Sequence, residues 1–111
     1  MADSGCLAAY VTMPDKDSAL VYCETLVRER LAACVNIMDH ASSVYWWQDA
    51  VQRAQECVCF FKTTDEQFPQ FLARAKELHP YEVPCIVAWP LEAGNPDFFN
   101  WIKAETTRAE S

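Results

Sequence analysis

The sequence predicts an α+β domain with a ferredoxin-like βαββαβ order, a long hairpin between its second and third strands, and an extra C-terminal helix. Three observations lead to this prediction. Apolar runs of strand length alternate with segments in which apolar residues recur every three or four positions. Short groups of turn-forming residues separate these segments. The resulting order is that of a split βαβ motif, in which two helices cover one face of an antiparallel sheet.

The first two elements are a buried strand and an amphipathic helix. Residues 6–12 form a continuous apolar run, as expected for a central strand, and Pro14 follows it. Asp15 is placed to cap the next helix, and apolar residues then recur at helical spacing as far as Leu31. This spacing predicts a helix of about four turns.

The next segment predicts a long β-hairpin. Its first arm runs over residues 32–37 and resumes at 43–47 after a break at residues 38–40. A turn at residues 48–50 leads into a second arm at 51–62, which is long enough to pair with the whole of the first arm.

A second helix is predicted from Thr64 and Gln67, which fit a capping box, and from the apolar stripe that follows them. Pro69 removes one backbone donor from the first turn. Either that turn is irregular, or the regular helix begins nearer Phe68.

The last predicted elements are a short strand and a helix. Residues 79–84 end the second helix, and residues 85–89 form another buried apolar run. Asn95 as the cap and Pro96 as the first helical residue then predict a final helix. Its polar tail after Lys103 is expected to fray.

Composition predicts a single domain spanning residues 1–111. The chain has 111 residues, of which 51% are hydrophobic, and this is enough for one core. Its net charge is −7, and its few basic residues are scattered, which argues against nucleic acid as a partner. No apolar stretch approaches the roughly 20 residues of a membrane span, and no signal peptide is visible. We therefore expect a cytoplasmic protein with no membrane partner.

The six cysteines are interpreted as free thiols rather than as a disulfide framework. In the reducing compartment that we expect, disulfides are rare. Most of the cysteines lie inside apolar runs, where a small hydrophobic residue fits, and we expect these to be buried: Cys6, Cys23, Cys57, Cys59 and Cys85. No Cys-x-x-Cys pair occurs, so the usual structural zinc site is not expected.

Three segments resemble the CutA family of divalent-cation tolerance proteins, in the family's order and spacing over nearly the whole chain. The first, LAACVNI, joins the first helix to the second strand, and the third, HPYEVP, precedes the last strand. The second is Ser-x-Tyr-x-Trp in the hairpin, followed by a glutamate and Lys-Thr. These segments, with two further matches, are residues 31–37, 43–47, Glu56, 62–63, 79–84, 12–15 and Trp101.

The resemblance implies a ferredoxin-like subunit in a homotrimer similar to that of the PII signalling proteins, with the chain itself as its partner. It also implies a role in divalent metal ion tolerance, with copper or another divalent cation as a weakly held cofactor. We expect binding of a metal or small ligand without turnover, and so not an enzyme. The alternatives are a PII-like structural or signalling trimer with no metal role, and an enzyme that depends on Cys34. The chain departs from the family at the hairpin turn, where Asp49 and Ala50 replace the usual glycine and lysine.

Aromatic residues in the hairpin indicate an oligomer interface. Because strand residues alternate between faces, Tyr45 and Trp47 share one face and Trp46 lies on the other. A sheet with helices on one side would expose one of these faces to water unless another subunit covered it. The alternative is that one tryptophan covers the monomer core.

Cys34 and His79 are the candidate metal ligands. From the residues alone, Cys34 fits a buried cysteine, whereas the resemblance adds a copper-ligand role, for which a soft thiolate suits Cu(I). His79 ends a helix, where it could either cap the helix or bind a ligand. An enzyme would use Cys34 as nucleophile and His79 as base, but apolar neighbours would raise the thiol pKa.

Glu56 and Lys62 are candidate ligand-binding residues because they share an otherwise apolar face of the third strand. Charges there need a partner or a polar cleft. They could form an ion pair within the sheet or between subunits. Alternatively, they could meet Tyr45 and Tyr81 in a cleft for an unknown small ligand, whose carboxylate or phosphate Lys62 would hold.

Overall fold

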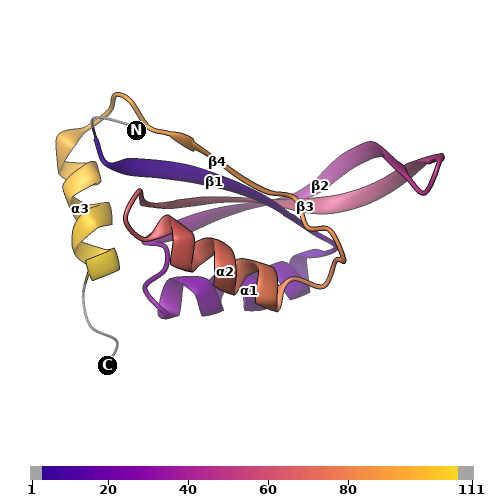
Figure 1. Cartoon of the computed structure of the whole chain (residues 1–111), viewed down its shortest axis with the longest axis horizontal. Helices are drawn as coiled ribbons and strands as arrows, with labels where there is room; N and C mark the ends of the chain where they lie inside the picture. Colours follow the sequence, from indigo (N-terminus) through magenta and orange to yellow (C-terminus); the bar gives the residue numbers. More distant parts are fainter. Residues whose placement is uncertain (1–3, 108–111) are drawn as a thin grey trace.

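The computed structural model describes residues 4–107 and confirms the predicted α+β, ferredoxin-like order (Figure 1). Four strands and three helices follow one another as β1 (Cys6–Met13), α1 (Lys16–Arg28), β2 (Cys34–Trp47), β3 (Ala50–Thr64), α2 (Phe68–Leu78), β4 (Ile86–Pro90) and α3 (Pro96–Thr107). No helix in this range is long and apolar enough to cross a membrane.

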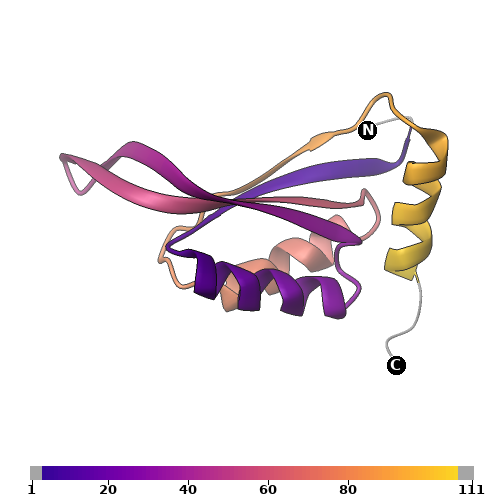
Figure 2. The same ribbon diagram turned by 180° about the vertical axis from the view of Figure 1, so that it is seen from behind.

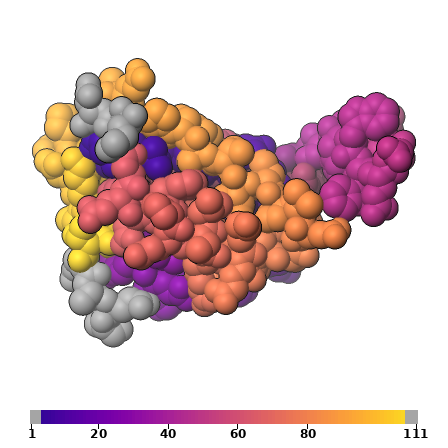
Figure 3. All heavy atoms as spheres, viewed as in Figure 1, coloured from indigo at the N-terminus to yellow at the C-terminus, as the bar shows by residue number. Residues whose placement is uncertain are grey.

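The sheet has the strand order β2-β3-β1-β4, and every neighbouring pair is antiparallel. Helices α1 and α2 lie on one face of it, and α3 lies across the end opposite the hairpin tip (Figures 1 and 2). The β2–β3 hairpin extends well beyond the rest of the molecule, as the space-filling view also shows (Figure 3). The far face of the sheet therefore carries neither α1 nor α2.

The core lies between the sheet and these two helices. Alternate residues of β1 point into it, and Ala9 and Val11 are fully buried there. Phe61 of β3 meets Phe71 of α2 edge to face, with ring centroids 4.9 Å apart. Complete burial of such an aromatic side chain contributes about 2–3 kcal/mol, so this layer holds the helices against the sheet.

Helix α1 begins where predicted but ends earlier. The Asp15 carboxylate caps it by accepting a hydrogen bond from the Ser18 backbone N–H at 2.8 Å. The predicted extension to Leu31 is wrong, because the helix ends at Arg28 and Arg30 is left-handed with a φ of 65°. The Leu31 N–H bonds back to the Leu26 carbonyl at 3.1 Å, as in a Schellman motif.

The predicted break in the first hairpin arm is a β-bulge inside one continuous strand. Pairing with β3 shifts by one residue between Met38 and Ala41, and His40 takes a φ of 66°. The Asp39 carboxylate accepts the His40 N–H at 2.8 Å and so supports this conformation. The turn itself holds only residues 48 and 49, because Ala50 already belongs to β3.

Helix α2 begins at Phe68, the second of the two predicted alternatives. Only half of the capping box forms. The Thr64 hydroxyl accepts the Gln67 N–H at 3.1 Å, but the Gln67 side chain reaches the Thr106 carbonyl at 2.7 Å instead of bonding back.

Two other boundaries differ from the prediction. Residues 104–107 are helical rather than frayed, because Thr106 is buried and Glu105 pairs with Arg30 at 2.8 Å. Residues 108–111 lie outside the described range. Strand β4 begins at Ile86, so Cys85 is exposed and not buried as expected, whereas the other four cysteines predicted to be core are buried.

Candidate functional site

The uncovered face of the sheet carries most of the predicted site residues. In β3, Phe61 points into the core, so Glu56, Phe60 and Lys62 point to the uncovered face. On that face Phe60 meets Tyr10 of β1 edge to face at 5.4 Å. The two charged residues therefore lie at opposite ends of an apolar stripe.

At one end of this stripe, Lys62 pairs across the sheet with Cys34 of β2. The Lys62 ammonium donates a hydrogen bond to the Asn36 side-chain oxygen and forms no ion pair with any carboxylate in residues 4–107. Burial raises the pKa of the half-buried Cys34 thiol, and the charge of Lys62 opposes this effect only in part. The thiol is therefore neutral at physiological pH, and Lys62 presents its charge beside it.

At the other end, Glu56 accepts a hydrogen bond from the Tyr81 hydroxyl, with the oxygens 2.7 Å apart. Glu56 lies just past the last pairing of β3 with β1, between Cys57 and Met13, where the hairpin leaves the body of the sheet. Glu56 is only 8% exposed. Burial and the neighbouring Glu56 carboxylate both raise the pKa of Tyr81 well above its usual range, so Tyr81 acts as a donor.

These two ends do not meet within one chain. Glu56 and Lys62 are six positions apart on one strand, which places them about 20 Å apart. The ion pair between them that we considered within the sheet therefore cannot form. Tyr81 belongs to the Glu56 end, where Tyr45 also raises its pKa, and the predicted group of four residues is divided in two.

His79 is buried and uses both of its ring nitrogens. Nε2 lies 2.8 Å from the Thr12 carbonyl oxygen, which can only accept, so Nε2 carries the proton. Nδ1 accepts the Tyr81 backbone N–H at 3.1 Å. Burial lowers the pKa of His79, although the Thr12 contact and the Glu56 charge oppose this shift. The ring is neutral, and in this arrangement it has no free lone pair for a metal ion.

Cys34 and His79 are not brought together. Lys62 pairs with Cys34 on one side and with Ala8 of β1 on the other, so Cys34 and Ala8 lie at the same height in the sheet. His79 contacts Thr12, which is four residues, or about 13 Å, further along β1 than Ala8. Within the described residues no three His, Cys, Asp or Glu side chains are placed to hold a metal ion. A single chain therefore supplies neither a His79 base for Cys34 nor a shared metal site, and metal ligation stays a prediction.

The hairpin aromatics are exposed on both faces. The exposed fractions are 44% for Tyr45, 74% for Trp46 and 39% for Trp47. These residues end β2 in the hairpin tip, which extends beyond the helices (Figure 1), and their exposure gives no support to the alternative in which one tryptophan covers the monomer core. Their place in an oligomer interface stays a prediction.

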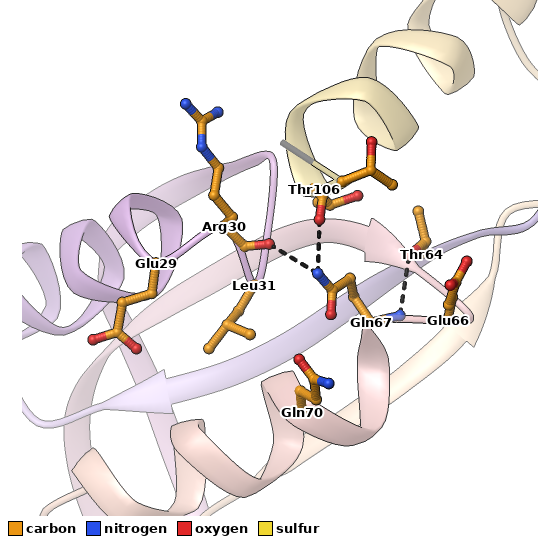
Figure 4. A pocket seen from close by; sticks show the side chains of 9 residues that line it. Glu29, Arg30, Leu31, Thr64, Glu66, Gln67, Gln70 and Thr106 are labelled. Atoms are coloured by element: carbon orange, nitrogen blue, oxygen red, sulfur yellow. Dashed lines mark hydrogen bonds between the residues drawn. The ribbon is translucent and has the colours of Figure 1, made fainter. Parts of the chain in front are cut away.

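One polar cavity lies outside every predicted site. It occupies about 490 Å³ between the end of α1, the start of α2 and the end of α3 (Figure 4). The Gln67 amide spans it, donating to the carbonyl oxygens of Thr106 and Arg30. Its lining contains no thiol or imidazole, and the side chain that crosses it joins backbone segments, so we interpret it as a structural joint.

Sequence reasoning missed Asn36 as the partner of Lys62. Strand alternation could have found it, because Cys34 and Asn36 share a face and the predicted hairpin places that face beside Lys62. The Thr12 carbonyl as the partner of His79 had no sequence signal, because it is a backbone group distant along the chain.

Comparison with known proteins gives a consistent family assignment. Residues 7–105 match the family model described as CutA1 divalent ion tolerance protein. The chain is 44% identical over 96 residues to the divalent-cation tolerance protein CutA of Thermus thermophilus, covering 86% of this chain and 93% of that protein. The crystal structure of CutA from Xylella fastidiosa superposes with a TM-score of 0.89 at 34% identity, covering 92% and 98% of the two chains. A structure from Archaeoglobus fulgidus, described as a periplasmic divalent cation tolerance protein, has a TM-score of 0.87 at 34% identity and covers 91% and 98%.

Proposed function

This chain belongs to the CutA1 divalent ion tolerance protein family, and we propose that it serves in divalent metal ion tolerance as a homotrimer that binds a ligand without turnover. The relatives' names support the tolerance role. The observation that carries the self-association is the uncovered sheet face together with the exposed aromatics of the hairpin.

This surface carries several exposed large apolar side chains, and a contiguous exposed apolar patch marks an interaction site. On the uncovered face, Val87 and Trp89 of β4 are 52% and 42% exposed. The hairpin adds the 74% exposed Trp46 and its two aromatic neighbours. A tight oligomer that covers both regions would remove this apolar area from water, which favours association.

Native mass spectrometry combined with light scattering tests this proposal. We expect a trimer at micromolar concentration, and we expect Trp47→Ala to weaken it, because that change removes an aromatic side chain from the predicted interface. Phe98→Ala is a matched control, since Phe98 is similarly exposed at 40% but lies on α3 at the other end of the molecule. A wild-type monomer at this concentration would refute the trimer.

We also propose that copper, or another divalent cation, binds weakly through Cys34. The support is a half-buried thiol on the uncovered face, where a soft Cu(I) ion is a suitable partner. Within residues 4–107 no three His, Cys, Asp or Glu side chains are placed to hold a metal ion together, so further ligands would have to come from other subunits. His79 is the weaker contributor, because its ring would have to give up one of its two hydrogen bonds to bind.

Anaerobic copper titrations of wild type, Cys34→Ser and a Cys57→Ser/Cys59→Ser variant test this assignment. Cys57 and Cys59 are fully buried, so we expect only Cys34→Ser to reduce binding. Loss of binding in the double variant alone would place the site at the Cys-x-Cys pair instead.

A small ligand is the second part of the proposal. Lys62 lacks a carboxylate partner in the described part of the chain, and we propose that it holds the carboxylate or phosphate of a ligand. Glu56, Tyr45 and Tyr81 form a second contact region, and the ligand could be shared between subunits. Thermal-shift screening of wild type and Lys62→Met against anions tests this, since equal shifts would remove Lys62 from the site.

Two alternatives differ from this proposal in their readouts. A structural trimer would show no ligand-dependent thermal shift, and a Cys34 enzyme would require a reactive, low-pKa thiol. Against the enzyme, burial raises the pKa of Cys34, and no histidine of the same chain is within reach of it.

A cytoplasmic location is part of the proposal, and cell fractionation tests it against the periplasmic location named for the Archaeoglobus relative.

A further inference from the structure

We propose that Glu56 and Tyr81 form the recognition point for a small organic cation, an alkylammonium or guanidinium group, with Tyr45 beside it. This inference rests on the proposed ligand-binding function and names the ligand class for one end of the uncovered face. It separates that end from Lys62, which suits an anion.

The first step is the state of the Glu56 carboxylate. The residue is only 8% exposed, and one of its oxygens accepts a single neutral hydrogen bond, from Tyr81 at 2.7 Å. No Lys, Arg or His nitrogen lies within 4.0 Å of it among residues 4–107. A buried carboxylate without a positive partner is costly, so this position favours the arrival of a cation.

The second step is that residues 4–107 offer no cation close to Glu56. His79 lies close to Glu56, but the ring is neutral and both of its nitrogens are engaged, by Thr12 and Tyr81. Lys62, on the same strand face, is about 20 Å away. The described part of the chain therefore does not supply the positive charge that this carboxylate favours.

The third step favours an organic cation over a metal ion. The described residues contain no group of three metal-ligating side chains, whereas a metal ion held by protein usually needs several. The surroundings of Glu56 are aromatic instead, and aromatic faces attract ammonium and guanidinium groups. Tyr81 is held in place by its ring contact with His79 at 4.8 Å and by its backbone bond to the same ring.

The fourth step is the position of Glu56 in the fold. Glu56 lies at the point where β3 passes the end of β1, and its hydrogen bond with Tyr81 places it beside the loop that joins α2 to β4. The hairpin leaves the body of the molecule in this region (Figure 1). Tyr45 pairs with Gln52 of β3 and so lies on the same face as Glu56, further along the hairpin. A cation entering here would have its charge at Glu56 and its alkyl part against Tyr45.

The test uses three probes of equal length and different charge: n-pentylammonium, n-pentanol and pentanoate. Each is titrated into the assembled protein and followed by NMR through the Tyr81 amide and the Trp47 indole. We expect saturable shifts with pentylammonium, and much weaker ones with the alcohol and the acid. Glu56→Gln keeps an acceptor for Tyr81 but removes the charge, so we expect the Kd for pentylammonium to rise about tenfold or more.

Two control variants accompany this measurement. Glu92→Gln removes an exposed carboxylate elsewhere and should leave the Kd unchanged. Lys62→Met should also leave pentylammonium binding unchanged, even if it abolishes the binding of anions. Native mass spectrometry of each variant establishes that the subunit count is the same.

Several outcomes would overturn the inference. Equal binding of pentanol and pentylammonium, or an unchanged Kd in Glu56→Gln, would show that the carboxylate does not select a cation. Loss of the oligomer in Glu56→Gln would show that Glu56 pairs with a basic residue of a second copy. Zn²⁺ alone could shift the same NMR signals with a lower Kd than pentylammonium. If this binding were lost in Glu56→Gln, the site would be a metal site. If anions bind through Lys62 while no cation binds, this inference fails and the proposed ligand function stands.

Discussion

Arg30 occupies a backbone conformation that usually belongs to glycine. Its φ of 65° closes the Schellman turn after α1, and this conformation costs a residue with a Cβ about 1–2 kcal/mol. Its guanidinium contacts both the Glu105 carboxylate at 2.8 Å and the Glu105 carbonyl oxygen at 3.3 Å. The strained position is therefore occupied by a side chain that joins α1 to α3.

Substitution of Arg30 separates the backbone effect from the ion pair. Arg30→Gly relieves the strain but loses the contacts with Glu105, so we expect little net change in the free energy of unfolding. Arg30→Ala loses the contacts and keeps the strain, so it should be less stable than Arg30→Gly by about 1 kcal/mol. Chemical denaturation at a fixed protein concentration measures both. Equal stability of the two variants would contradict the strain.

His79 gives the fold a dependence on pH. Burial lowers its pKa in the folded state. Below the unfolded pKa of about 6.5, the unfolded chain therefore binds a proton at this residue more readily than the folded chain does. The stabilising effect of a neutral His79 is complete above that pH and is lost as the pH falls. Its neighbours are Glu56, which opposes the shift, and the rings of Tyr22 and Tyr81.

We expect the free energy of unfolding to fall between pH 7 and pH 5 by up to about 1.4 kcal/mol per pH unit from this one group. In His79→Gln, which is less stable at pH 7, the slope should be smaller. His40→Asn is the control, because the His40 side chain is 80% exposed, and its slope should match wild type. Parallel slopes in wild type and His79→Gln would assign the pH dependence to other groups.

At the scale of elements, the hairpin turn shows how far a sequence pattern reaches. The turn predicted at residues 48–50 contains the two turn residues of the structure, but only the structure shows that both have positive φ, 50° for Gln48 and 66° for Asp49. Two consecutive left-handed residues make a type I′ turn, which favours Asn-Gly. The chain tolerates a less suitable pair here.

Replacing Asp49 with glycine should therefore stabilise the hairpin. For Asp49→Gly, we expect a gain of up to about 1 kcal/mol, because glycine adopts positive φ without steric cost. Ala50→Gly is the matched control, since Ala50 belongs to β3, where glycine weakens a strand. Hydrogen exchange at the amides of residues 44–53 measures the local effect. A loss of protection in Asp49→Gly would contradict the assigned turn.

The bulge explains why the sequence could not place the aromatics relative to Cys34. Simple alternation from Cys34 would put Trp46 on its face, because both positions are even. The extra residue at 39–40 reverses this, so Tyr45 and Trp47 share the face of Cys34 and Glu56 instead. The order and the type of the elements followed from local apolar spacing. A one-residue bulge depends on a pairing between distant segments, which the pattern alone does not reveal.

The helix ends were mispredicted for a similar reason. Apolar spacing continued to Leu31, but this residue packs under the Schellman turn instead of extending α1. The tail of α3 looked polar and free, yet Thr106 is buried and meets the Gln67 side chain. In both places, contacts between segments far apart in the sequence decide where the helix ends.

For the whole molecule, the main feature is that the outer hairpin has few contacts with the rest of its own chain. Strand β2 pairs only with β3. Toward the hairpin tip, the pairing of β3 with β1 ends at Cys57, so residues 50–56 of β3 have only β2 as a partner. Most residues of the hairpin tip are exposed. A two-stranded ribbon of this kind is marginally stable alone in water, so its order should depend on what covers it.

We therefore expect the protection of the tip to depend on protein concentration. Hydrogen exchange at residues 41–47 should be slow in the oligomer and should accelerate on dilution or in Trp47→Ala. Amides of β1, in the centre of the sheet, should respond much less. Fast exchange at the tip under all conditions would argue that no second copy covers it.

The candidate site was predictable in its residues but not in its grouping. Glu56, Lys62 and Cys34 share the uncovered face, as alternation and the hairpin pairing indicate, whereas Tyr45 lies on that face only because of the bulge. Their distribution into two ends depends on distance along an extended strand, and the position of Tyr81 depends on a loop without regular structure. Alternation predicts that Glu56 and Lys62 share a face, but the strand between them is long enough to keep them about 20 Å apart.

Strand β2 is the longer of the two edge strands of the sheet, and its free edge presents backbone donors and acceptors along a strand of 14 residues. In a newly synthesised chain, we expect this edge to pair with the first extended segment that reaches it. A sister copy leads to assembly, and a foreign strand leads to aggregation. The proportion of chains that mature should therefore rise with the local rate of synthesis, so that several ribosomes on one messenger RNA would favour correct assembly more than the same number of chains made far apart.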